Sequence, residues 1–69
     1  MTIHWCGTGL SAIPGLRELI SEGADVTVWN RSRDKAVATV GDLTDRIETF
    51  DMDAIGAALA PGDVVVSMP

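Results

Sequence analysis

The sequence is poor in the residues that build disulfide frameworks, metal sites and catalytic dyads, with one cysteine, Cys6, and one histidine, His4. A single cysteine excludes an internal disulfide, which fits a reducing compartment. Structural zinc needs four ligands, so these two side chains alone do not make a metal site. No nucleophile–base pair can be assembled around the one histidine. We therefore assign no catalytic or metal-ligating residue, and interpret His4 and Cys6 as buried strand residues.

Basic residues and long apolar runs are also scarce. Five Lys and Arg oppose ten Asp and Glu, and the resulting net charge of −5 repels polyanions, which excludes general nucleic-acid binding. No apolar stretch approaches the roughly 20 residues that cross a bilayer. The N-terminus also lacks the basic and apolar regions of a signal peptide. We expect a cytoplasmic protein without a membrane partner.

The chain is short for an enzyme. Its 69 residues, 46% of them hydrophobic, allow one small globular domain. A chain of this length buries only about 60% of the surface that it exposes when unfolded, so its core is marginal. A cofactor domain and a substrate domain together need about 200 residues or more. If the motifs belong to a large enzyme, a C-terminal substrate domain is therefore missing.

The spacing of apolar residues alternates between strand and helix periods. Strands are predicted over 2–6, 25–29, 46–50 and 63–67, and helices over 11–22, 33–40 and 53–60. This βαβαβαβ order predicts an α/β fold with a Rossmann-like parallel sheet, in which the fourth strand is apolar enough for the middle of the sheet. A complete doubly wound domain continues past a fourth strand, so 1–69 is interpreted as the truncated N-terminal portion of a dinucleotide-binding domain. The exposed edges of such a sheet favour pairing with another chain, as in a homo-oligomer.

A glycine motif lies between the first strand and the first helix. Residues 7–12 read G-T-G-L-S-A and match the pattern G-x-G-x-x-A. Gly7 permits the tight turn, Gly9 lets a pyrophosphate approach the backbone, and the small Ala12 allows close packing of helix on strand. The helix N-terminus favours phosphate through its free N–H groups. Two glycines can simply form a turn, but their place between strand and helix predicts dinucleotide binding.

The end of the second strand distinguishes the two nicotinamide cofactors. In NAD-specific sites an acidic residue about 20 positions past the glycines binds the ribose 2′-hydroxyl, and here Asn30 stands in its place. Arg31 offers a fork of donors suited to phosphate, and Ser32 adds a hydroxyl and a helix N-cap. We interpret Arg31 as a 2′-phosphate ligand, and Arg33 and Lys35 as solvated charges. The site therefore predicts NADP(H) rather than NAD(H).

Two further strand ends complete the expected site. Asp51 and Met52 follow the third strand, whose end borders the adenine pocket in this fold. Asp51 can accept a hydrogen bond from the adenine amino group or cap the following helix, and both interpretations stay open. Ser67 and Met68 lie at the end of the fourth strand, where the crevice crosses the carboxyl ends of the strands, so contacts with ribose or nicotinamide are expected.

Three segments together resemble a known family. The segments IHWCGTGLS (3–11), VTVWNRS (26–32) and GDVVVSMP (62–69) resemble the N-terminal NADP-binding domain of the saccharopine dehydrogenase family. The WNRS segment also looks like the 3-hydroxyisobutyrate and 6-phosphogluconate dehydrogenase group. That group usually has Met-Gly in the turn after Gly9, where this chain has Ser11 and Ala12. The saccharopine dehydrogenase resemblance is therefore the one that we favour.

This resemblance implies an NADP-dependent oxidoreductase that acts on a C–N bond of saccharopine or a related amino acid, with hydride exchanged at the nicotinamide. By position, the resemblance implies that the pyrophosphate is held by Gly7, Thr8, Gly9, Leu10 and Ser11. It implies that the 2′-phosphate ribose is held by Asn30, Arg31 and Ser32, and that Asp51 and Met52 border the adenine. The family's substrate and catalytic residues lie in a later domain, so a non-catalytic nucleotide-binding or regulatory module stays an alternative. A flavodoxin-like receiver domain is disfavoured, because it needs an acidic cluster where this chain has the glycine turn.

Overall fold

The computed structural model describes residues 1–7 and 13–67, and strands and helices alternate along them. The elements in chain order are β1 (Ile3–Cys6), α1 (Ile13–Ser21), β2 (Val26–Asn30), α2 (Arg33–Val40), β3 (Ile47–Thr49), α3 (Met52–Ala58) and β4 (Val64–Ser67). Every strand and helix expected from the sequence is present, with small shifts at the ends. No helix in the described ranges has the length and the apolar character needed to cross a membrane.

The four strands form one sheet in the order β3-β2-β1-β4, and every neighbouring pair is parallel. This confirms the α/β class and the parallel sheet. Cys6 on β1 lies opposite Trp29 on β2 and Ser67 on β4, so the carboxyl ends of these strands meet at one edge of the sheet. The expectation that the fourth strand occupies the middle of the sheet is wrong. β4 is an edge strand, and Val64 and Val65 are 42% and 49% exposed.

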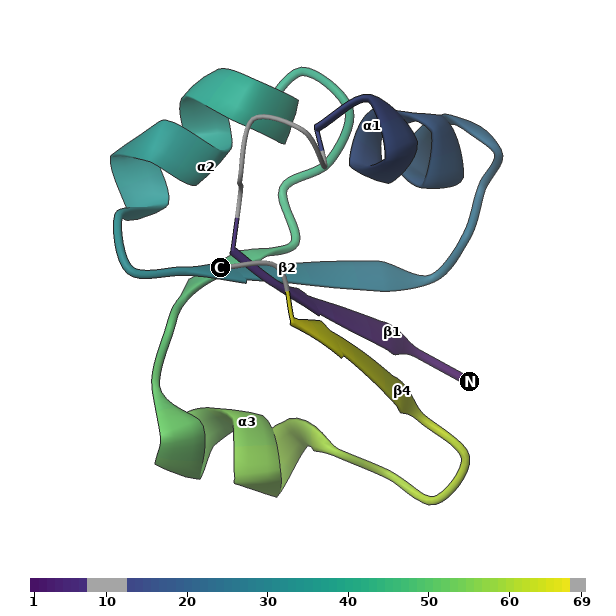
Figure 1. The fold of residues 1–69 in the computed structure, drawn as a ribbon, viewed down its shortest axis with the longest axis vertical. Coiled ribbons are helices and arrows are strands. Elements are labelled where there is room, and N and C mark those ends of the chain that lie inside the picture. Colours follow the sequence, from purple (N-terminus) through teal and green to yellow (C-terminus); the bar gives the residue numbers. More distant parts are fainter. Residues whose placement is uncertain (8–12, 68–69) are drawn as a thin grey trace.

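Helices cover both faces of the sheet, α1 and α2 on one face and α3 on the other (Figure 1). The core under α1 and α2 is the larger and consists of Trp5, Leu16, Val26, Val28, Ala36, Val40 and Ile47. The core under α3 consists of Cys6, Trp29 and Ile55, with the half-buried Phe50 packed against it. Among the described residues, the core on the face that carries α3 is therefore the smaller of the two.

The helix ends follow from local sequence chemistry. The Ser32 hydroxyl accepts a hydrogen bond from the backbone N–H three residues later, and the Asp51 carboxylate accepts from the N–H groups of Asp53 and Ala54 at 2.9 and 3.3 Å. Both residues are therefore N-caps, which satisfy helix N–H groups that have no intrahelical partner. Gly23 ends α1 with φ +86°, a conformation that glycine adopts without steric cost.

Candidate functional site

The carboxyl edge of the sheet gathers the described candidate residues. Gly7 follows β1, the segment 30–32 lies at the end of β2, Asp51 and Met52 follow β3, and Ser67 ends β4. Backbone hydrogen bonds join these strand ends: the Gly7 N–H donates to the Trp29 carbonyl at 2.7 Å, and the Phe50 N–H donates to the Asn30 carbonyl at 2.8 Å. The candidates outside the described residues are Thr8, Gly9, Leu10, Ser11, Ala12 and Met68.

Gly7 has the backbone conformation that the turn requires. Its φ of +96° lies in the region where a side chain is strained. Its N–H continues the hydrogen bonding to β2 just past the last residue of β1. The chain therefore leaves the sheet at Gly7, beside Trp29 of β2, and the rest of the glycine motif lies outside the described residues.

The end of β2 is a short loop built around Arg31. The Asn30 side-chain amide donates to the Ser32 carbonyl at 2.8 Å, and the Ser32 hydroxyl caps α2. The two flanking side chains therefore hold the loop, whereas Arg31 is exposed and its guanidinium has no hydrogen-bond or ion-pair partner among the described residues. Within the part of the chain that the structure describes, the loop therefore presents an unpaired guanidinium at the edge of the sheet.

The basic residues outside the window 31–35 are already engaged. Arg17 makes a bidentate pair with Asp42, with N–O distances of 2.8 and 2.9 Å, and Arg46 pairs with Asp25. The side-chain hydrogen bonds from these arginines hold the pKa of both carboxyl groups below the ordinary value. Positive charge that remains available to an outside anion is therefore concentrated in the window 31–35.

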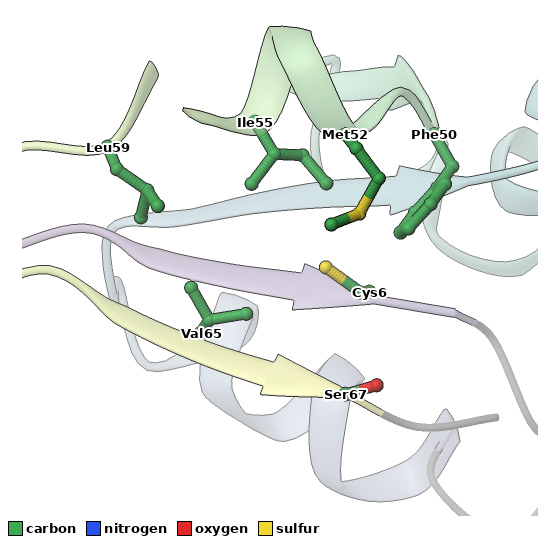
Figure 2. Close-up of a pocket in the computed structure, with 7 residues that line it drawn as sticks. All are labelled: Cys6, Phe50, Met52, Ile55, Leu59, Val65 and Ser67. Carbon is green, nitrogen blue, oxygen red and sulfur yellow. The ribbon is translucent and has the colours of Figure 1, made fainter. Parts of the chain in front are cut away.

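Asp51 and Met52 lie where the adenine contact is expected. The helix-cap interpretation of Asp51 is confirmed by its two hydrogen bonds to α3, and the adenine contact stays a prediction. Met52 is 73% exposed and lies at the rim of a groove of about 320 Å³ (Figure 2). The groove is lined by Cys6, Phe50, Met52, Ile55, Leu59, Val65 and Ser67. Nothing in the sequence pattern pointed to this groove, because it forms between α3 and the exposed strand β4.

His4 is buried, as expected, but it belongs to a hydrogen-bonded chain that the sequence did not reveal. Its Nδ1 accepts from the Trp29 indole N–H at 3.1 Å, and its Nε2 lies 3.1 Å from Asp63 Oδ2. Because an indole nitrogen only donates, the neutral ring carries its proton on Nε2 and donates it to Asp63. Asp63 also accepts from the N–H groups of Thr2 and Ala60. These bonds, with that from His4, lower the pKa of Asp63 to about 2.

Cys6 is the remaining side chain with reactive chemistry. It is buried at the base of the groove, and desolvation raises the pKa of its thiol, so the thiolate that reacts with electrophiles is disfavoured. In the described part of the chain, no three His, Cys, Asp or Glu side chains gather as metal ligands would. The sheet edge around Arg31 therefore remains the strongest candidate site.

Comparisons with protein-family models, with curated proteins and with solved structures find no match. Function is therefore inferred from the residues and the geometry of the chain itself.

Proposed function

We propose that this chain binds NADP(H) at the carboxyl edge of its sheet, as the N-terminal portion of a Rossmann-like dinucleotide-binding domain. The observation that carries the proposal is the exposed Arg31, which follows β2 directly and lies beside Asn30, where an NAD-specific site has a carboxylate. Asn30 carries no charge that would repel a 2′-phosphate, and the guanidinium fork of Arg31 is suited to bind one. When bound, the cofactor supplies the nicotinamide ring that gives or takes a hydride.

The topology supports this proposal. The order β3-β2-β1-β4, with helices on both faces, is compatible with the order of the doubly wound dinucleotide-binding fold. In such sheets ligands bind beyond the carboxyl ends of the strands, at the point where the strand order reverses. That point lies between β1 and β4, whose ends carry Gly7 and Ser67.

The proposed contacts run along this edge. The pyrophosphate lies over the turn that begins at Gly7, and the 2′-phosphate ribose lies against the loop of Asn30, Arg31 and Ser32. Adenine lies against Met52 and Asp51, and the nicotinamide side lies towards the end of β4. The same proposal assigns pyrophosphate contacts to Thr8, Gly9, Leu10 and Ser11, and a contact near the nicotinamide to Met68.

The family resemblance extends the proposal to an oxidoreductase of the saccharopine dehydrogenase type, acting on a C–N bond of an amino acid. In this proposal the chain holds and orients the cofactor, and a further domain contributes the substrate and the catalytic groups. Arg17 and Arg46 are engaged in ion pairs, so the unpaired Lys and Arg side chains of the described residues lie in the window 31–35, which favours a site near Arg31.

The test is a titration of the chain with NADPH and with NADH, followed by calorimetry and by tryptophan fluorescence. Trp29 lies two residues before Arg31 on β2, so binding at this edge should change its emission. We expect NADPH to bind about 5- to 150-fold more tightly, the equivalent of about 1–3 kcal/mol for a charge-assisted contact. The nucleotides 2′-AMP and 5′-AMP are the matched probes, and 2′-AMP should be the better competitor. Equal affinities, or no binding of either dinucleotide, would contradict the proposal.

A further inference from the structure

We propose that His4 is an acid-responsive switch: protonation of its ring releases the indole of Trp29 and loosens the end of β2 that carries Arg31. Cofactor binding therefore weakens as the pH falls, and this second step rests on the proposed function. The inference has three supports: the burial of His4, the hydrogen bonds at its two ring nitrogens, and the position of Trp29 beside the candidate site.

The two ring nitrogens of His4 have opposite roles. Nδ1 accepts from the Trp29 indole N–H at 3.1 Å, and Nε2 donates to Asp63 Oδ2 at 3.1 Å. His4 is 3% exposed and Trp29 is 5% exposed, so the bond between them lies away from solvent. A neutral ring offers one donor and one acceptor, whereas an imidazolium offers two donors and no acceptor. The arrangement therefore fits only a neutral ring with its proton on Nε2.

Protonation breaks one of these two bonds and strengthens the other. A proton from solvent adds to the lone pair of Nδ1, so that Nδ1–H then faces the indole N–H and the bond to Trp29 is lost. The bond from Nε2 becomes a charge-assisted bond between an imidazolium and a carboxylate. Asp63 is still ionised at that point, because hydrogen bonds from the backbone N–H groups of Thr2 and Ala60 lower its pKa to about 2. The ring therefore stays on Asp63, and the indole is the partner that must move.

The neighbouring strands add no unbalanced charge beside the ring in the described part of the chain. On β2 the register partner of His4 is Thr27, whose hydroxyl accepts from the Arg46 guanidinium at 2.8 Å. That guanidinium is paired with Asp25, so the two charges offset each other. On β4 the register partner of His4 is the apolar Val65.

The other groups of this core are uncharged. α3 contributes Ile55, whereas Asp51 and Asp53 at the start of that helix are exposed. The Cys6 side chain lies on the same face, and burial raises the pKa of its thiol, which keeps the thiol protonated. Histidine is the residue type that changes charge between about pH 5 and 8, and His4 is the one histidine of the chain. An acid response of this core in that range therefore belongs to His4.

Trp29 connects the ring to the candidate site. Its backbone carbonyl accepts from the Gly7 N–H at 2.7 Å, and Asn30 and Arg31 follow it directly. Phe50 packs against the core that holds the indole, and its N–H donates to the Asn30 carbonyl at 2.8 Å. Because protein interiors are close-packed, a displaced indole moves its neighbours. Release of Trp29 therefore disturbs both the turn at Gly7 and the loop that presents Arg31.

Two substitutions separate the two bonds of the ring. His4→Asn puts an amide oxygen near the place of Nδ1, so it keeps an acceptor for the indole and has no proton to gain in this pH range. His4→Gln puts its amide near the place of Nε2, so it can donate towards Asp63 but leaves the indole without an acceptor. At Trp29, His4→Asn thus mimics the neutral ring and His4→Gln mimics the protonated ring.

The first measurement is NMR of the isotope-labelled full chain between pH 8 and pH 5, without cofactor. At pH 8 the imidazole nitrogen shifts should show a proton on Nε2 and none on Nδ1. On acidification the Trp29 indole N–H resonance should shift together with the ring of His4. The Trp5 indole is the internal control and should not shift with them, because it lies in the core on the other face of the sheet. In His4→Asn neither indole should shift.

The second measurement is calorimetric titration with NADP+ at pH 8 and at pH 5.5. A 2′-phosphate itself takes up a proton near pH 6, and His4→Asn is the matched control that retains this effect. From pH 8 to pH 5.5 the affinity of the parent chain should fall about fivefold or more beyond the fall in His4→Asn, a factor at the lower end of the usual coupling between two sites. At pH 8, His4→Gln should already bind about fivefold more weakly than His4→Asn. Circular dichroism verifies that each variant is folded at both pH values.

Three results would overturn this inference. The first is a proton on Nδ1 at pH 8, and the second is a Trp29 indole resonance that shifts no more than that of Trp5. The third is an equal pH dependence of NADP+ affinity in the parent chain and in His4→Asn. Absence of NADP+ binding at pH 8 instead contradicts the proposed function, and the NMR titration, which needs no cofactor, then decides whether His4 releases Trp29.

Discussion

Replacing His4 by glutamine should leave the indole N–H of Trp29 without an acceptor inside the smaller core. A glutamine amide can still donate towards Asp63, but it places no acceptor where the ring Nδ1 lies, 3.1 Å from the indole nitrogen. Trp29 is only 5% exposed, so water does not replace the lost partner. A buried donor without a partner costs about 1–3 kcal/mol.

This loss is large for a chain of 69 residues, whose whole stability is about 3–10 kcal/mol at 0.05–0.15 kcal/mol per residue. With a urea dependence of about 1 kcal/mol per molar, the unfolding midpoint should fall by about 1–3 M. Urea titration followed by far-ultraviolet circular dichroism measures this shift. An unchanged midpoint would show that the bond from Trp29 to His4 contributes nothing to stability.

A double-mutant cycle isolates the bond itself. Trp29→Phe removes the donor, so in the His4→Gln background it also removes the orphaned N–H. The two substitutions should therefore be less damaging together than the sum of their separate effects, with a coupling free energy of about 1–2 kcal/mol. Effects that add to within about 0.5 kcal/mol would refute the reasoning.

Three further predictions concern stability. The pKa of Asp63 falls from 3.8 to about 2 on folding, so its contribution to the free energy of unfolding is present above about pH 4 and is lost as the pH falls towards 2. In Asp63→Asn, the urea midpoint should therefore depend less on pH over that range than in the parent chain. Gly62 has a φ of +89°, so Gly62→Ala should lower the free energy of unfolding by about 1–2 kcal/mol in the same urea titration. Gly56 lies in α3 with open space around it, so Gly56→Ala should raise the free energy of unfolding by about 0.5–1 kcal/mol. Trp5→Phe should cost less than Trp29→Phe, because the Trp5 indole nitrogen has no hydrogen-bond partner among the described residues; an equal cost would contradict this.

The element order was predictable because short runs of β-branched and aromatic residues, such as 26–29, alternate with segments whose apolar residues have helical spacing, such as Ile13, Leu16 and Ile20. His4 and Cys6 were interpreted as buried strand residues, and both are buried, as is Trp5 between them. The caps at Ser32 and Asp51 were also readable, because a short polar side chain before an apolar helical pattern satisfies the first N–H groups.

Contacts between strands were not predictable, because they depend on register. His4 reaches Trp29 only because Cys6 pairs with Trp29 and places both side chains on the α3 face. The position of β4 was misjudged for a related reason. A run of valines indicates a buried strand, but which strand lies at the edge depends on the topology, and here the edge falls on Val64 and Val65. The groove beside β4 follows from that edge position.

The most direct test of the central claim is the ratio of NADPH to NADH affinity in Arg31→Ala, with Arg33→Ala as the matched control. Both arginines are exposed and lie in the same basic window, but only Arg31 is assigned to the 2′-phosphate. We predict that Arg31→Ala weakens NADPH binding by about 5- to 150-fold, leaves NADH binding unchanged, and so abolishes the preference. Arg33→Ala should retain the preference for NADPH over NADH. An equal loss for both cofactors in Arg31→Ala, or the same change in both variants, would contradict the assignment of this strand end to NADP(H).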